Sequence, residues 1–156
     1  MFRKLTLALF SAILLAAAVP AAAQNAKNVG VGFILGEPTG IDAKFWLADS
    51  HALEFAAAWS LSDNEEFHLQ GDYLFHKWDV FDITTGDDFP LYFGIGGRVI
   101  LIDHFDDVVG IRFPVGLSYI FANYPFDIFG AIVPILDIAP DSDFDLEGAI
   151  GARFWF

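Results

Sequence analysis

The stretch LYFGIGGRVIL, residues 91–101, decides the fold of this chain because apolar side chains occupy every second position along most of it. In an extended chain Phe93, Ile95 and Val99 point to one side, whereas Arg98 points to the other side together with small glycines. A period of two residues is the signature of a β-strand with one apolar face. The stretch therefore predicts a strand, and the rest of the chain repeats its pattern.

Similar alternation defines further predicted strands along the chain. It is clear in residues 41–47, 53–59, 67–75, 109–119 and 144–156, and weaker in residues 29–36 and 126–138. Acidic, turn-rich segments separate these runs. In residues 126–138 both faces are apolar, and Pro134 predicts a bulge or a strand end because proline cannot donate to the ladder. About eight strands joined by short turns predict an antiparallel meander, and closing it removes the exposed edges.

The start of the chain has a composition of its own. Arg3 and Lys4 precede an apolar run from Leu5 to Val19, and Pro20 and three alanines follow. This order is typical of a secretory signal peptide, and the run is shorter than the roughly 20 residues that a spanning helix needs. We therefore expect residues 1–23 to be a cleaved signal peptide and residues 24–156 to form one barrel domain.

Composition limits the function classes. The formal net charge is −13, although 55% of the residues are hydrophobic, so charged and apolar residues must be segregated on different faces. An acidic chain is not attracted to phosphates, and we expect no nucleic-acid partner. The chain has no cysteine, which excludes a lipidated cysteine anchor and a disulfide framework.

The basic residues in the predicted strands indicate which way the apolar face points. The face opposite the apolar set carries four basic and four acidic residues: Lys44, Arg98, Arg112, Arg153, Asp42, Glu54, Asp72 and Glu147. An Arg or Lys on the lipid face costs about 2–4 kcal/mol at the middle of a membrane, so a membrane barrel hides such residues in its lumen. We expect these eight residues to form a structural charge network in the lumen, matched four to four, with glycines and alanines making room for them.

The predicted fold class is all-β, a closed eight-stranded antiparallel up-and-down transmembrane β-barrel whose lumen is filled by side chains. Aromatic residues near strand ends fit interfacial girdles; they are Trp46, Trp59, Tyr119, Tyr124 and Trp155. With both termini periplasmic, the connection from Lys77 to Pro90 falls on the side where turns are normally short. Either the adjoining strands extend past the membrane, or the strand count is off by one hairpin.

The signal-like start, the eight alternating segments and the final Gly151-Ala152-Arg153-Phe154-Trp155-Phe156 resemble small bacterial outer-membrane β-barrels of the OmpA/OmpX type. In that family the last strand ends in an aromatic residue with apolar residues at alternate positions before it, and Phe154 and Phe156 match this pattern. The resemblance implies a location in the cell outer membrane, contact with outer-membrane lipid, and an assembly signal at Phe154 and Phe156 that the barrel-assembly machinery reads. It implies no particular activity.

No motif for catalysis, a cofactor or a metal ion stands out. His68 and His76 share one face of a predicted strand, but eight residues of strand place them roughly 26 Å apart, too far to share a metal ion. We therefore expect a monomeric, non-enzymatic barrel with no cofactor and a structural or surface-interaction role. Two alternatives stay open: a lipid A-modifying outer-membrane enzyme, and a soluble lipocalin-like carrier of an apolar ligand.

Overall fold

The computed structural model describes residues 28–37, 39–60, 66–82, 85–103 and 105–156, so the predicted signal peptide lies outside the described residues. The described residues contain nine strands: β1 Val29–Gly36, β2 Gly40–Ala48, β3 His51–Ser60, β4 Glu66–Lys77, β5 Leu91–Ile102, β6 Val108–Arg112, β7 Val115–Ile120, β8 Phe126–Ala139 and β9 Asp143–Trp155. Within this part of the chain, no helix has the length and apolar character needed to span a membrane.

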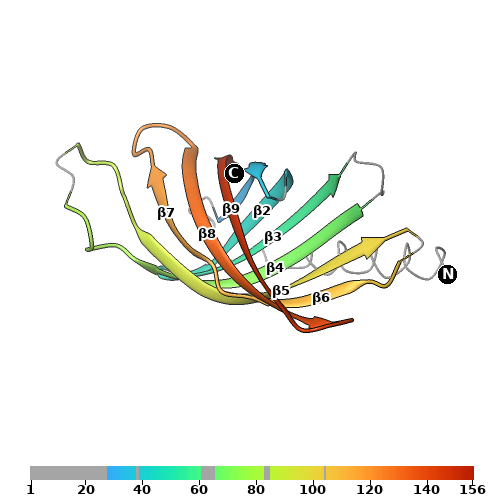
Figure 1. The fold of residues 1–156 in the computed structure, drawn as a ribbon. Helices are drawn as coiled ribbons and strands as arrows, with labels where there is room; N and C mark the ends of the chain where they lie inside the picture. The colour runs from blue at the N-terminus through green and yellow to red at the C-terminus, as the bar shows by residue number, and fades with distance from the viewer. Residues whose placement is uncertain (1–27, 38, 61–65, 83–84, 104) are drawn as a thin grey trace.

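The strands form one antiparallel sheet that closes into a ring (Figure 1). Each strand from β1 to β5 pairs with the next, β8 pairs with β9, and β9 pairs with β1. β6 and β7 both lie between β5 and β8, so they are two halves of one barrel strand. The predicted closed, eight-stranded antiparallel β-barrel is thus confirmed.

Two prolines explain the gap between β6 and β7. Pro114 lies in the gap, and the neighbouring Phe113 donates its N–H to the carbonyl oxygen of Pro134 in β8 (2.9 Å). Pro134 has no N–H, so it cannot donate the second hydrogen bond of this pair back to Phe113. The expected bulge or strand end at Pro134 is not found, because Pro134 pairs in register with Leu146. The lost hydrogen bond interrupts the neighbouring strand instead.

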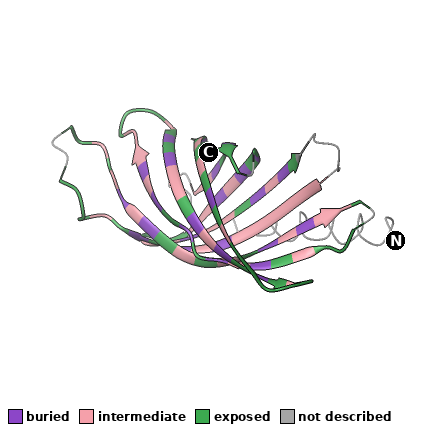
Figure 2. Cartoon of the chain, in the orientation of Figure 1, coloured by how far each residue is buried: buried purple, intermediate pink, exposed green. Residues whose placement is uncertain are grey.

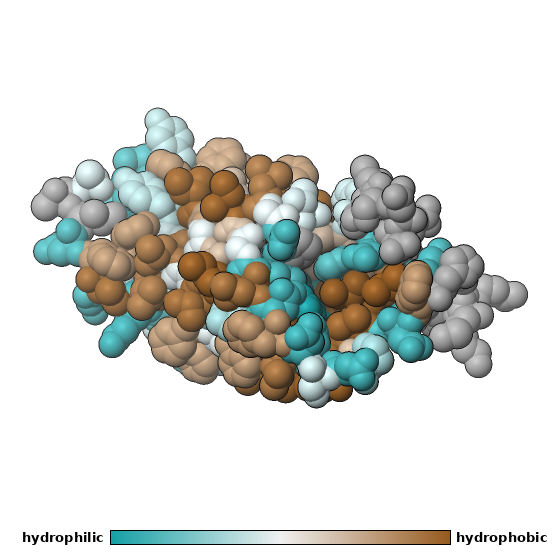
Figure 3. All heavy atoms as spheres, viewed as in Figure 1, coloured by the Kyte–Doolittle hydropathy of each residue, from teal (hydrophilic) through white to brown (hydrophobic). Residues whose placement is uncertain are grey.

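Burial alternates along the strands, as Figure 2 shows for β8. Outward side chains are largely apolar, and Phe33, Ile132 and Ile150 expose 68%, 61% and 64% of their surface. Figure 3 shows such residues over much of the visible face. Inward side chains are buried, and Lys44 and Arg153 each expose only 1%. The barrel is therefore apolar outside and charged inside.

The barrel has two different ends. The loop end is where β1, β3, β5 and β8 end, and the terminus end is where β2, β4, β7 and β9 end. The connection between β4 and β5 lies at the terminus end and projects beyond the strands (Figure 1). Because β4 ends at Lys77 and β5 begins at Leu91, the strand count is not off by a hairpin.

Candidate functional site

Ion pairs in two groups fill the lumen. In the loop-end cluster, Arg98 donates from Nε and Nη2 to the two carboxylate oxygens of Asp137 (3.0 and 2.6 Å) and from Nη1 to Glu147 (2.5 Å). Arg112 donates from Nη1 to the other oxygen of Glu147 (2.8 Å) and from Nε to Asp72 (3.1 Å). Nη1 of Arg98 also lies 3.0 Å from a carboxylate oxygen of Asp145, whose side chain is half-exposed. Glu147 therefore joins the two arginines, and the ion pairs link strands across the barrel.

The terminus-end cluster is centred on Arg153 of β9. Its Nε and Nη2 each donate to Asp127 of β8 (both 3.1 Å), and its Nη1 donates to Asp42 of β2 (3.1 Å) and Glu54 of β3 (2.5 Å). Lys44 places its Nζ 3.8 Å from Glu54. One guanidinium thus binds carboxylates from three strands.

A glycine separates each arginine from an aspartate two barrel strands away. Gly110 of β6 pairs with Arg98 of β5 on one side and with Asp137 of β8 on the other. A Cβ at Gly110 would collide with the Asp137 carboxylate. The same arrangement recurs in the triplets Arg112–Gly96–Asp72 and Arg153–Gly32–Asp42. The missing side chain on the middle strand is what allows each arginine to reach across it.

Aromatic rings close the lumen at the terminus end. Trp46 packs on His76 (ring centroids 4.4 Å apart) and stacks on Trp78 and Trp155 (5.6 and 6.1 Å). Lys44 lies beside them and donates from Nζ to Nε2 of His76 (2.8 Å). The expectation that Trp46 and Trp155 belong to an outer girdle is wrong. Both occupy inward positions of their strands, each two residues from an inward basic residue.

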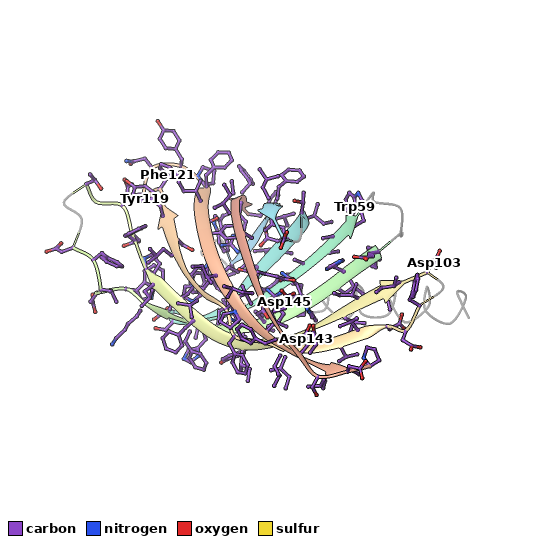
Figure 4. The ribbon with its side chains drawn as sticks, in the orientation of Figure 1. Trp59, Asp103, Tyr119, Phe121, Asp143 and Asp145 are labelled. Carbon is purple, nitrogen blue, oxygen red and sulfur yellow. The ribbon has the colours of Figure 1, made fainter. Side chains whose placement is uncertain are left out.

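A polar pocket of about 610 Å³ opens at the loop end. Its lining includes Glu37, Trp59, Glu66, His68, Arg98, Asp145 and Glu147. Figure 4 shows Trp59 at this end, opposite Tyr119 and Phe121. The Arg98–Glu147 pair belongs to both the pocket and the loop-end cluster, so the pocket leads down to the ion pairs. In the part of the chain that the structure describes, no three His, Asp or Glu side chains are placed to hold a metal ion.

The structure distributes the eight predicted lumen residues between the two clusters and adds Asp127 and Asp137. We did not predict these two because residues 126–138 are apolar on both faces. Asp127 and Asp137 are separated by an even number of residues, which places both on one face of a strand and is the sequence pattern that indicates a shared inward face. The expected four-to-four match is wrong: among the described residues, seven carboxylates, including the half-exposed Asp145 beside Arg98, pair with four basic side chains.

The residues expected to act as an assembly signal lie on the outer face at the terminus end. Phe154 packs against Phe126 and Phe156 (ring centroids 5.1 and 5.0 Å apart). The N–H of Phe156 donates to the carbonyl oxygen of Val29 (2.8 Å), which extends the seam between β9 and β1. Recognition of the two side chains by the assembly machinery stays a prediction.

No family model and no curated protein sequence matches this chain. Its fold is similar to that of the N-terminal β-barrel domain of Pseudomonas aeruginosa OprF, with a TM-score of 0.59 and 14% identity over 85% of this chain and 100% of that one. It is also similar to Neisserial surface protein A (NspA), with a TM-score of 0.50 and 12% identity over 83% of this chain and 95% of that one. At these identities the likeness concerns the fold alone.

Proposed function

We propose that the chain is a monomeric, non-enzymatic outer-membrane β-barrel that crosses the bilayer with its eight barrel strands and makes surface contacts through its loop end. The observation that carries this proposal is the inverted burial of the barrel. Large apolar side chains such as Phe33 and Ile150 are exposed on the wall, whereas Lys44 and Arg153 are buried in the lumen.

Lipid is the solvent that suits this arrangement. Soluble monomers rarely expose contiguous apolar patches larger than a few hundred Å². In hydrocarbon every backbone polar group needs an internal partner, and a closed ring of strands leaves no edge of unpaired groups. A soluble carrier of an apolar ligand needs the opposite arrangement, with an apolar interior, and the ion pairs of both clusters argue against it.

The filled lumen supports a structural or surface role in preference to transport. Arg98, Arg112 and Arg153 bridge opposite parts of the wall through their carboxylate partners, and Trp46 and His76 cover the terminus end. The polar pocket at the loop end opens to solvent and is the part of the lumen that a surface partner could reach. One protein of similar fold is named a surface protein, which supports extending a surface location to this chain.

Single-cysteine labelling tests the location, since the chain has no cysteine of its own. Asp141 is exposed just after β8, and Ile132 faces outward within β8. In intact Gram-negative cells we expect a membrane-impermeant maleimide to label Asp141→Cys and to leave Ile132→Cys unlabelled. The barrel should fractionate with the outer membrane and show heat-modifiable mobility on a gel. Recovery in the soluble periplasm, or equal labelling at both positions, would refute the proposal.

Lipid A analysis tests the absence of enzymatic activity on the nearest abundant substrate. We expect the mass spectrum of lipid A from cells that overproduce the barrel to match that of cells carrying an empty vector. A change in acylation would overturn the non-enzymatic proposal and favour a lipid A-modifying enzyme.

A further inference from the structure

The connection between β4 and β5 is long for the terminus end and carries exposed apolar residues. Its described parts are residues 78–82 and 85–90. Val80 and Phe81 expose 41% and 43% of their surface, although neither belongs to a strand. Acidic residues flank them, and Asp79 and Asp82 are exposed. The connection is therefore amphipathic and needs an explanation beyond joining two strands.

Aromatic side chains join this connection to the outer wall in a continuous row. The ring of Phe81 packs on Phe89 (centroids 5.3 Å apart), Phe89 on Tyr119 (6.0 Å) and Tyr119 on Phe121 (4.9 Å). We refer to Val80, Phe81, Phe89, Tyr119 and Phe121 as the aromatic ledge. Figure 4 shows Tyr119 and Phe121 together at the end of β7.

Hydrogen bonds fix the ledge to the end of β7. Asp88 and Ile120 exchange backbone hydrogen bonds, with N–H to oxygen distances of 3.1 and 2.8 Å. Asp87 accepts from the hydroxyl of Tyr119 (2.5 Å) and from the N–H of Ala122 (2.9 Å). These hydrogen bonds therefore hold the connection against the end of β7.

The ledge continues the apolar outer face of the barrel. Phe89 is separated by an even number of residues from the outward Leu91 and Phe93 of β5, as Tyr119 is from the outward Val115 of β7. Both rings therefore continue the outward face of their strands. Tyr and Trp are enriched at membrane–water interfaces, where the ring meets the headgroups and its polar group reaches water. Tyr119 is such a residue, and the exposed acids beside Phe81 give the connection a polar side.

We propose that the aromatic ledge lies in the headgroup region of the leaflet at the terminus end, so that its partner is the phospholipid surface itself. This inference rests on the proposed membrane location. The ledge lies against lipid because it is continuous with the apolar wall, which hydrocarbon covers. The long connection is then an interfacial anchor that extends the barrel sideways into the interface.

Depth-dependent quenching tests the ledge in phosphatidylcholine–phosphatidylethanolamine vesicles. Single cysteines at Val80 and Phe81 carry an NBD fluorophore, and Ile132→Cys and Asp141→Cys serve as wall and water controls. Val80→Cys leaves all four rings of the ledge intact, so it covers the case in which Phe81→Cys disturbs the row. We expect doxyl groups near the lipid headgroup to quench NBD at positions 80 and 81 more strongly than at position 141, and iodide present on both sides of the membrane to quench it less.

The controls separate the two proposals. If lipid quenches position 132 while iodide quenches positions 80 and 81 as strongly as position 141, the ledge proposal is wrong and the membrane barrel stands. Protection of positions 80 and 81 from both quenchers would also overturn it, because the ledge would then be covered by protein. If lipid fails to quench position 132 as well, the membrane location itself fails.

Discussion

Replacing Gly110 by alanine should break one specific ion pair without disturbing the backbone. A Cβ at Gly110 would overlap the Oδ1 atom of Asp137, and its other near neighbours are side-chain carbons of Ile135 and Arg98, at 3.1 and 3.4 Å. No backbone atom is among these three nearest contacts. The new methyl group therefore has to displace the carboxylate that accepts two hydrogen bonds from Arg98.

The expected cost follows from the burial of that pair. The side chains of Arg98 and Asp137 are 5% and 11% exposed, and removing one partner of a buried ion pair costs about 3–5 kcal/mol. Arg98 keeps Glu147 at 2.5 Å, so we expect the low end of this range, about 3 kcal/mol. Replacing glycine by alanine inside an unobstructed strand instead stabilises by roughly 0.5–1 kcal/mol.

Gly97 supplies the matched control on the neighbouring strand. It faces outward, and a Cβ there would meet only the carbonyl oxygen of Gly110 at an ordinary 3.6 Å. Urea unfolding of the barrel in lipid vesicles, followed by the fluorescence of its four tryptophans, measures both variants. We expect Gly97→Ala to be neutral or slightly stabilising and Gly110→Ala to be clearly destabilising.

A double-mutant cycle with Asp137→Ala identifies the cause. Once the carboxylate is gone, the Gly110 methyl group has free space, so Gly110→Ala should cost little in the Asp137→Ala background. The reasoning is refuted if Gly110→Ala is as harmless as Gly97→Ala. It is equally refuted if the cost of Gly110→Ala is unchanged without Asp137, because the methyl group would then be acting on something else.

Three further predictions concern the wall, the last strand and the long connection. Ile132→Arg should destabilise the barrel in vesicles by about 2–4 kcal/mol, measured by urea unfolding, because it puts a charge on the lipid face; an unchanged midpoint would contradict the proposed membrane position. Phe156→Ala should slow insertion in cells, measured by pulse-chase appearance of the heat-modifiable form, whereas Phe33→Ala, which removes an equally exposed ring, should not; equal rates would argue against an assembly signal. Hydrogen bonds from the Tyr119 hydroxyl and a backbone N–H hold the pKa of Asp87 below its usual value. Ionised Asp87 therefore stabilises the connection fully above about pH 4, and this stabilisation is lost as the pH falls through the lowered pKa. A spin label on the connection should become mobile over that acidic range, and mobility independent of pH would disprove the role of Asp87.

The number of strands and the direction of their faces could be predicted from the sequence because both depend on local alternation. A period of two residues assigns each side chain of a strand to one face, and the buried Arg98, Arg112 and Arg153 show that the faces were assigned correctly. Alternation carried no such information in β8, where residues of both faces are apolar, and Asp127 and Asp137 were missed there.

The partners of each arginine could not be predicted, because they depend on closure and stagger of the ring and not on sequence distance. Arg153 reaches Asp42 across 111 positions of the chain, and Arg98 reaches Asp137 across 39. A position near a strand end predicts an interfacial girdle for Trp155, but its register with the inward Arg153 places it in the lumen. Register is the better guide at a strand end when the strand also carries a buried charge.

The position of Arg153 ties its ion pairs to the closure of the barrel between β9 and β1. Its carboxylate partners come from β8 on one side of β9 and from β2 and β3 beyond the seam with β1. An open sheet would leave the guanidinium short of two carboxylates, and a seam slipped by one residue would turn it toward the apolar outer wall. Only a correctly registered seam therefore brings Arg153 to all three of its carboxylate partners.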